Sequence, residues 1–260
     1  YQNNIAIPGA NQTDYIVLQS GTYHATLFSF TGCTLSTAAV VITVNPAPSS
    51  GFNIDIPEQC FAGNRFVFTD TSTIAAGTMQ YDWNLGDGST STSTDVIHSY
   101  AQAGTYIVKL LVTSDLGCKD SVFFTVIVNA SPVAGFGVNT NEQCFAANQF
   151  VFSNTSTLSA GNMQYNWDLG DGNTMTTRDV THSYISPGIY AVKLLVSTDK
   201  GCADSSSFDV TVNPSPVAGF SVANAQQCFT NNLFNFINST SISSGSLQYA
   251  WDLGDGTTAT

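Results

Sequence analysis

The chain has 260 residues, of which 43 % are hydrophobic and 9 % are charged, and its formal net charge is −12. With only six Lys and Arg residues, it is repelled by phosphate backbones and by anionic lipid, which argues against nucleic acid as a partner and against membrane-surface binding. No apolar run approaches the ~18 residues that span a bilayer, so direct membrane insertion is not expected either. The opening residues YQNNIAIPGA look like the middle of a domain rather than a signal peptide.

Residues 1–46 differ from the rest of the chain. Their stretch SGTYHATLFSFTGCTLSTAAVVITVNP parallels PGIYAVKLLVSTDKGCADSSSFDVTVNP at 187–214, but no WDLGDG motif precedes it. We interpret 1–46 as the C-terminal part of a divergent β-sandwich domain.

The remaining chain repeats with a period of 84 residues. Tryptophan recurs at this spacing as Trp83, Trp167 and Trp251, and cysteine recurs as Cys60, Cys144 and Cys228. The period predicts two complete units, 47–130 and 131–214, and the N-terminal part of a further unit at 215–260. Proline lies at each boundary, as in VNPSPVAGF, which predicts short semi-rigid linkers. The sequence is therefore interpreted as a slice through a longer repeat array.

Within a unit the hydrophobic period is two. Tyr165, Trp167 and Leu169 face one way while Asn166 and Asp168 face the other, and the strand-like runs are separated by Gly, Ser, Asn and Pro. This pattern predicts an all-β sandwich. The tryptophans are expected to be central core residues rather than exposed platforms for carbohydrate; the three are Trp83, Trp167 and Trp251.

The stretch YNWDLGDG at 165–172, followed by THSYISPGIY, resembles the polycystic kidney disease (PKD) domain family. Leucine replaces the family's usual phenylalanine at Leu85, Leu169 and Leu253, and Asn84 replaces the first aspartate. The resemblance implies tandem seven-stranded immunoglobulin-like sandwiches arranged head to tail as a rod, an extracellular setting, and an immunoglobulin-like character for 1–46. The paired motifs QCF and GC are similar to those of very long cell-surface adhesins of Bacteroidetes-type bacteria, some of which act in gliding motility.

This resemblance and the repeats together predict a protein that is not an enzyme. The expected role is the stalk or filament of a secreted cell-surface adhesin. Its expected partners are neighbouring repeats of the same chain, surface polysaccharide and other cell-surface proteins. The alternative is a spacer, or a set of carbohydrate-binding modules, in a secreted polysaccharide- or protein-degrading enzyme.

Six cysteines without metal-type spacing predict disulfides and an oxidising compartment. In an immunoglobulin-like sandwich, Cys60 and Cys118 lie near opposite poles, more than ~20 Å apart, whereas a disulfide requires Cα atoms within ~7 Å. Where units follow head to tail, Cys60 instead approaches Cys202 of the next unit. We therefore favour an inter-repeat Cys60–Cys202 bond.

The remaining cysteines would then pair with units outside this sequence; they are Cys33, Cys118, Cys144 and Cys228. The rival pairing within units, Cys60–Cys118 and Cys144–Cys202, stays open, because the loop before the second strand is long enough to fold back. A pair of sequence neighbours, Cys118–Cys144, is a third arrangement.

The aspartates of the repeated motif are the main candidates for chemistry. Asp168 and Asp171 resemble a glycosidase pair, but Asn84 removes one of the two acids in the preceding unit. Capping of the glycine turn by Asp171 is the favoured interpretation. Calcium is the weaker one, with Asp87, Asp171 and Asp255 as candidate ligands.

No other cofactor is expected. His98 and His182 are interpreted as hydrogen-bonding residues at strand ends, because each stands alone in its unit. The resemblance further implies that Ser121, in the triplet DSV, accepts an O-glycan.

Overall fold

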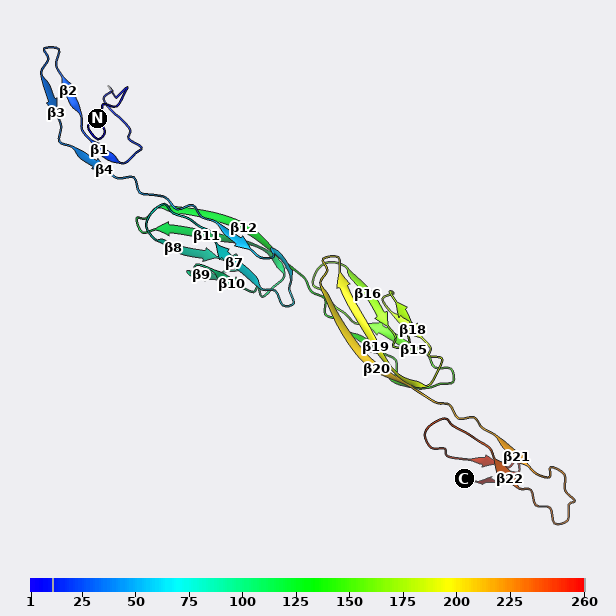
Figure 1. The fold of residues 1–260 in the computed structure, drawn as a ribbon. Coiled ribbons are helices and arrows are strands. Elements are labelled where there is room, and N and C mark those ends of the chain that lie inside the picture. Colours follow the sequence, from blue (N-terminus) through cyan, green and yellow to red (C-terminus); the bar gives the residue numbers. More distant parts are fainter. Residues whose placement is uncertain (11, 260) are drawn as a thin grey trace. The chain divides into compact units, whose positions relative to one another are not determined.

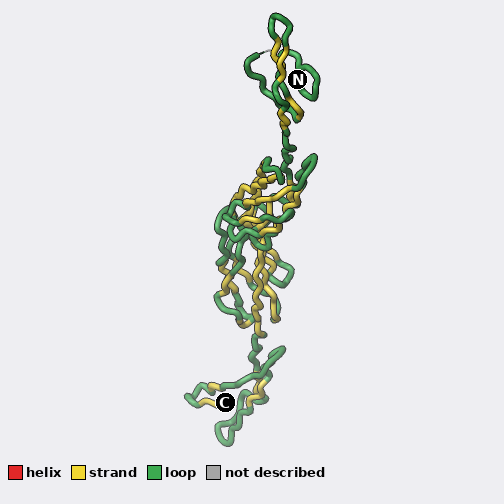
Figure 2. The backbone as a smooth tube through the Cα atoms, turned by 90° about the vertical axis from the view of Figure 1, so that its left-hand side faces the viewer, coloured by secondary structure: helices red, strands yellow, loops and turns green. Residues whose placement is uncertain are grey.

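The computed structural model describes residues 1–10 and 12–259. These residues form strands and loops and no helix (Figure 2), so the described chain contains no helix that could cross a membrane. Its contacts divide it into two units, residues 1–59 with 63–128 and residues 60–62 with 129–260. The expectation of an all-β protein with tandem sandwiches is confirmed.

The segment 1–46 has four short strands. They are β1 (Gly21–Tyr23), β2 (Thr26–Phe28), β3 (Thr34–Ser36) and β4 (Val40–Ile42). β1 pairs with β4 and β2 pairs with β3, both antiparallel. Most of its apolar side chains are exposed, including Phe28 and Val41.

Residues 49–129 form the first complete sandwich. Its strands are β5 (Phe52–Ile54), β6 (Glu58–Cys60), β7 (Phe66–Asp70), β8 (Met79–Asn84), β9 (Thr90–Ser91), β10 (Val96–His98), β11 (Gly104–Ser114) and β12 (Lys119–Asn129). One sheet has the order β10-β7-β5, and the other has the order β6-β12-β11-β8-β9. In Figure 1 the two long strands β11 and β12 run side by side through this sandwich.

Residues 133–213 repeat the arrangement. Their strands are β13 (Phe136–Val138), β14 (Glu142–Cys144), β15 (Phe150–Asn154), β16 (Met163–Asp168), β17 (Thr174–Met175), β18 (Val180–His182), β19 (Gly188–Thr198) and β20 (Ala203–Asn213). The sheets have the orders β13-β15-β18 and β14-β20-β19-β16-β17.

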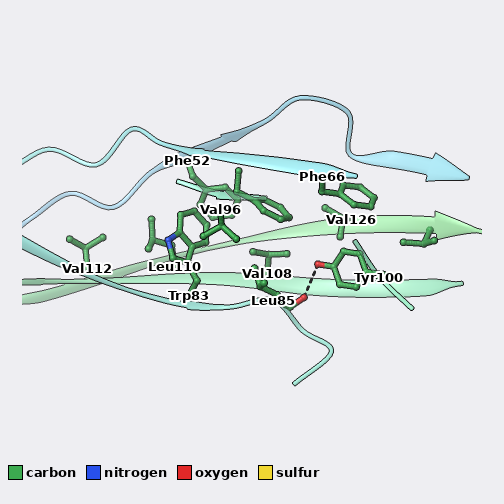
Figure 3. Close-up of a cluster of buried hydrophobic side chains, with 12 residues drawn as sticks. Phe52, Phe66, Trp83, Leu85, Val96, Tyr100, Val108, Leu110, Val112 and Val126 are labelled. Atoms are coloured by element: carbon green, nitrogen blue, oxygen red, sulfur yellow. Dashed lines mark hydrogen bonds between the residues drawn. The ribbon is translucent and has the colours of Figure 1, made fainter. Parts of the chain in front are cut away.

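Each sandwich has its own core between the two sheets. Trp83 and Trp167 are fully buried, and their indole Nε1 atoms donate to the carbonyl oxygens of Ser93 and Thr177 at 2.8 and 2.9 Å. Figure 3 shows Trp83 converging with Phe52 in the first core, where the ring centroids are 4.9 Å apart. Burial alternates along β11 and β19, since every second residue is drawn into the core.

The short strands β6 and β14 add an edge that the sequence pattern does not predict. β14 pairs in parallel with the end of β20, with Cys144 opposite Asn213, and β6 lies beside β12 in the equivalent sheet. Cys60 therefore ends a strand rather than lying in an open loop. With the two-residue strands β9 and β17, each sandwich has eight strands where the family resemblance implies seven.

The last segment follows the second sandwich, and its assignment to a further repeat stays a prediction. Its described strands are β21 (Phe220–Val222), β22 (Phe236–Asn238), β23 (Trp251–Asp252) and β24 (Thr258–Ala259). Phe220 packs edge-on against Trp251, with the ring centroids 5.5 Å apart. Phe136 packs against Trp167 in the same way, with a centroid distance of 5.0 Å. Trp251 is half-buried. The role of Trp251 as a core residue stays a prediction.

Candidate functional site

A disulfide joins two cysteines far apart in the sequence. The sulfur atoms of Cys60 and Cys202 are 2.02 Å apart, and the Cα atoms are 5.5 Å apart. Cys60–Ala62 groups with residues 129–260, so the bond lies within that unit. Cys202 is buried in the turn between β19 and β20, where its carbonyl accepts from the Thr198 amide at 2.9 Å.

The residues beside this bond hold the linker that starts at Asn129. The Phe61 amide donates to the Asn129 carbonyl at 2.8 Å, and the Ala62 amide donates to Ser131 Oγ at 2.9 Å. Further along, the Ala134 amide donates to Asp204 Oδ2 at 2.8 Å. The disulfide and these hydrogen bonds form one site, which we call the junction site. It consists of Cys60–Ala62, 129–134 and Cys202–Asp204.

Parts of the same site recur at the other boundaries. At one, Ser50 donates from its amide and its hydroxyl to Asp120 Oδ2 at 2.8 and 2.9 Å, two residues after Cys118. At the other, the Phe145 amide, next to Cys144, donates to the Asn213 carbonyl at 2.7 Å. The cysteines that are not bonded within the described chain are Cys33, Cys118, Cys144 and Cys228. Their pairing with units outside the sequence stays a prediction.

The rival pairing of Cys60 with Cys118 and of Cys144 with Cys202 does not occur in the structure, because Cys60 and Cys202 are bonded to each other.

The repeated aspartate motif forms the turn after its strand. Asp168 Oδ1 accepts from the Gly170 amide at 3.0 Å, and Asp171 Oδ1 accepts from the Asn173 amide at 3.1 Å. Asn84 Oδ1 accepts from Gly86 at 2.9 Å in the preceding sandwich, so an amide oxygen serves the same purpose as a carboxylate. The position requires an acceptor and not an acid, which favours a turn over a catalytic pair.

The other carboxylate oxygen of the motif contacts a histidine. Asp87 Oδ2 lies 2.7 Å from His98 Nε2, and Asp171 Oδ2 lies 2.7 Å from His182 Nε2. Burial raises the pKa of Asp171, but hydrogen bonds from His182 and Asn173 outweigh it and hold that pKa below its usual value. Each histidine therefore has an aspartate partner, although no sequence motif beside the histidine indicates this Asp–His pair.

A buried tyrosine completes this end of each sandwich. Tyr100 donates from its hydroxyl to the Leu85 carbonyl at 2.7 Å (Figure 3), and Tyr184 does the same to Leu169 at 2.8 Å. Burial raises the pKa of Tyr184 far above its usual range, so it remains a donor. The HSY motif at 182–184 therefore supplies two hydrogen-bonding side chains, those of His182 and Tyr184.

The next tyrosine of each unit bonds to backbone. The Tyr106 hydroxyl donates to the Gln102 carbonyl at 2.8 Å, four residues upstream, and Tyr190 donates to Ser186 in the same way. This geometry is that of a tyrosine corner.

Calcium would need several free oxygen ligands. Among the described residues no group of three or more His, Cys, Asp or Glu side chains could hold a metal ion. Asp87 and Asp171 are engaged as described above, and Asp255 Oδ1 accepts from the Thr257 amide at 2.9 Å. Ser121 lies on β12 opposite Leu111 and is half-buried. Its assignment as a glycan acceptor stays a prediction.

Comparison with known proteins places these features in a family. A family model described as PKD domain matches residues 45–128 and 129–212. The pre-pro-metalloprotease PrtV of Vibrio cholerae is 31 % identical over 166 residues, which are 62 % of this chain and 17 % of PrtV. Human polycystin-1 is 25 % identical over 185 residues, which are 68 % of this chain and 4 % of polycystin-1.

A solved structure of the PKD1 domain from the same V. cholerae metalloprotease is 36 % identical, with a TM-score of 0.29; the match covers 32 % of this chain and 96 % of that domain. The chain spans less than a fifth of the length of the two curated relatives. These relatives give no support to a Bacteroidetes origin or to similarity with gliding-motility adhesins.

PKD domains are non-catalytic modules typical of extracellular proteins. The family model covers 45–212, well over half of the chain, and both matched stretches fold into the sandwiches described above. The chain therefore belongs to the PKD domain family and carries these domains in tandem.

Proposed function

We propose that this chain is a non-catalytic spacer within a longer extracellular protein, its parent. The parent also carries a protein- or polysaccharide-degrading domain. The observation that carries the spacer role is the junction site, in which Phe61, Ala62 and Asp204 hold the linker by hydrogen bonds and Cys60 is bonded to Cys202. Linker residues that are held by hydrogen bonds beside a disulfide support a spacer role.

The similarity to a metalloprotease supports the enzyme context. PrtV is a metalloprotease by name and matches 166 residues of this chain. The polar side chains of the repeated motif are used in turns and strand ends, as the contacts of Asp171 and His182 illustrate. Their use in structure supports a spacer that leaves catalysis to another part of the parent.

The stalk of a cell-surface adhesin, with gliding motility as one setting, is a second candidate. The observation that favours it is the exact 84-residue period shared by Cys60, Cys144 and Cys228. If the bond observed at Cys60 recurs, each of these cysteines pairs with one 142 residues further on. Such an array would suit a long stalk whose partners are its own neighbouring repeats, surface polysaccharide and other surface proteins.

The parent protein tests the two candidates. We would purify it from the culture medium with an antibody against this chain and delete 47–214 from its gene. For an enzyme spacer, we expect hydrolysis of a small soluble substrate to be unchanged and hydrolysis of an insoluble polymer to fall.

A parent without hydrolase activity, made of many repeats and attached to the cell surface, would overturn the enzyme context and support the stalk. Binding of this chain to a glycan array would instead support a carbohydrate-binding module. Trp83 and Trp167 are buried and offer no stacking surface for such binding.

A further inference from the structure

The disulfide closes a covalent loop around nearly all of both cores. Cys60 and Cys202 are 142 positions apart in the sequence. Of the buried residues that form the two cores, only Phe52, Val210 and Val212 lie outside the loop. Every strand of the first sandwich lies inside the loop except β5 and the start of β6. Every strand of the second sandwich lies inside it except β20.

We propose that the Cys60–Cys202 bond is tension-bearing. A force that pulls on the chain passes through this bond and not through the polypeptide of the two complete sandwiches between the two cysteines. The proposal goes beyond the spacer role and applies to this chain whichever parent contains it.

The order of covalent bonds along the chain shows why the force bypasses the sandwiches. A force that pulls on the two ends of the chain enters through the residues before Cys60 and leaves through those after Cys202. As long as the bond lasts, the two Cα atoms remain 5.5 Å apart. Residues 61–201 therefore cannot be drawn out between them, and unfolding either core releases no length from inside the loop.

The lengths at stake are large. A fully extended chain spans ~3.5 Å per residue, so the 142 positions between the cysteines correspond to about 500 Å. Without the bond this length becomes available when the sandwiches unfold. With the bond, only the segments outside the loop can lengthen, which include β5 and β20.

The junction site supports this use of the bond. Cys202 is 1 % exposed and sits in a turn closed by the Thr198 amide and hydroxyl, the latter accepting from the Cys202 amide at 3.2 Å. The chain leaving Cys202 enters β20, which pairs with β19 along its whole length, from Ala203 opposite Ser197 to Val212 opposite Gly188. Force passed through the bond is thus delivered to the start of a long paired strand.

Single-molecule force spectroscopy on the whole 260-residue chain tests the proposal. The chain is held by peptide tags at its two ends, so that no cysteine is used for attachment. The contour length is measured first without reductant and then in dithiothreitol. The reagent's two thiols close to a cyclic disulfide, and Cys60 and Cys202 each return to a thiol, which balances the two electrons and two protons transferred.

We expect the maximum contour length to increase by about 500 Å after reduction, and the variant Cys60→Ser with Cys202→Ser to show the longer value without reductant. Cys144→Ser is the matched control, because Cys144 occupies the equivalent position but is not bonded; it should keep the short value. Contour length is informative even if the reduced chain loses its fold, since an unfolded loop is also released only when the bond is broken.

The proposal is wrong if the unreduced wild-type chain already reaches the longer contour length, or if reduction leaves the length unchanged. Either result concerns the bond alone. The spacer role is tested independently by the activity of the parent protein, so the two failures can be told apart.

Discussion

The pairing of His98 with Asp87, and of His182 with Asp171, is the main titratable feature at the scale of single residues. Both pairs have a separation of 2.7 Å and a largely covered carboxylate. Burial raises the pKa of Asp87, but hydrogen bonds from the Ser89 amide and from His98 outweigh it and lower that pKa overall.

The sign of the pH effect follows from this lowered pKa. An aspartate with a depressed pKa in the folded state contributes stability that is present above its unfolded value, about 3.9, and is lost as the pH falls through the folded value. We therefore expect the melting temperature to fall between pH 5 and pH 2.5, and to fall less steeply in a variant that combines Asp87→Asn with Asp171→Asn.

Thermal unfolding followed by circular dichroism checks this expectation. Asp14→Asn, in the exposed first segment, should leave the slope unchanged. Part of the slope should survive in the double variant, because hydrogen bonds also lower the pKa of Asp55 and Asp120. A double variant as acid-sensitive as the wild type would contradict the assignment.

At the scale of elements, the turn between β16 and β17 requires two glycines for different reasons. Gly170 has φ +79° and Gly172 has φ +91°, both in the region that disfavours a side chain. A Cβ at Gly170 would lie 2.9 Å from the nitrogen and the oxygen of Ala191 on β19, whereas one at Gly172 would meet nothing within 4 Å.

Alanine substitutions should separate these two effects. Both variants incur the positive-φ cost of roughly 1–2 kcal/mol, and Gly170→Ala should cost about 1–3 kcal/mol more because the backbone of β19 must move. Denaturant unfolding monitored by tryptophan fluorescence measures the difference. Equal losses in the two variants would show that the close approach of the turn to β19 does not constrain it.

In the junction site, one carboxylate of β20 holds the linker. Asp204 Oδ2 accepts from the Ala134 amide at 2.8 Å. We expect Asp204→Ala to speed hydrogen exchange at the Ala134 amide by roughly 10- to 100-fold, since a hydrogen bond to a charged group contributes about 1.5–3 kcal/mol. Asp209→Ala, on the same strand, is the control and should leave that amide unchanged.

Much of each sandwich is predictable from the alternation of its strands. The alternation through Tyr165, Trp167 and Leu169 separates core from surface, and Trp167 and Leu169 are fully buried. The contact of His182 with Asp171 could not be predicted in the same way, because the two residues lie 11 apart, His182 at the end of β18 in one sheet and Asp171 in a turn of the other. Nor could β14, whose three residues have no distinctive pattern and pair in parallel with a strand that follows much later.

At the scale of the whole molecule, the cysteines give the most direct check on connectivity. In the intact chain we expect a thiol reagent to label Cys33, Cys144 and Cys228, which are exposed, and to label Cys118 more slowly because it is half-buried. Cys60 and Cys202 should react only after reduction.

Peptide mapping under non-reducing conditions measures this labelling. Cleavage at Lys and Arg leaves Cys33 and Cys60 together in 1–65, and Cys202 and Cys228 together in 201–260. A second cleavage at acidic residues, such as Glu58 and Asp209, separates them. A Cys60–Cys118 peptide would contradict the connectivity and remove the basis of the tension-bearing loop.

The distance between the poles of a sandwich predicts this pairing, whereas no local motif around Cys60 does so. The sequence does not predict the hydrogen bonds of the junction site, because Ala62 and Ala134 donate through backbone amides and their side chains carry no signal. Backbone contacts of this kind depend on how the linker is folded.

The short outer strands of each five-stranded sheet have a consequence for synthesis and secretion. β14 has three residues and β17 has two, so the sheet that they border offers few unpaired backbone groups to another chain. Adjacent repeats of nearly the same sequence are at high local concentration while they fold, and an exposed long edge would invite them to pair with each other. The brevity of these strands should therefore keep each copy folding with itself, which allows many copies to stand in one polypeptide without aggregating.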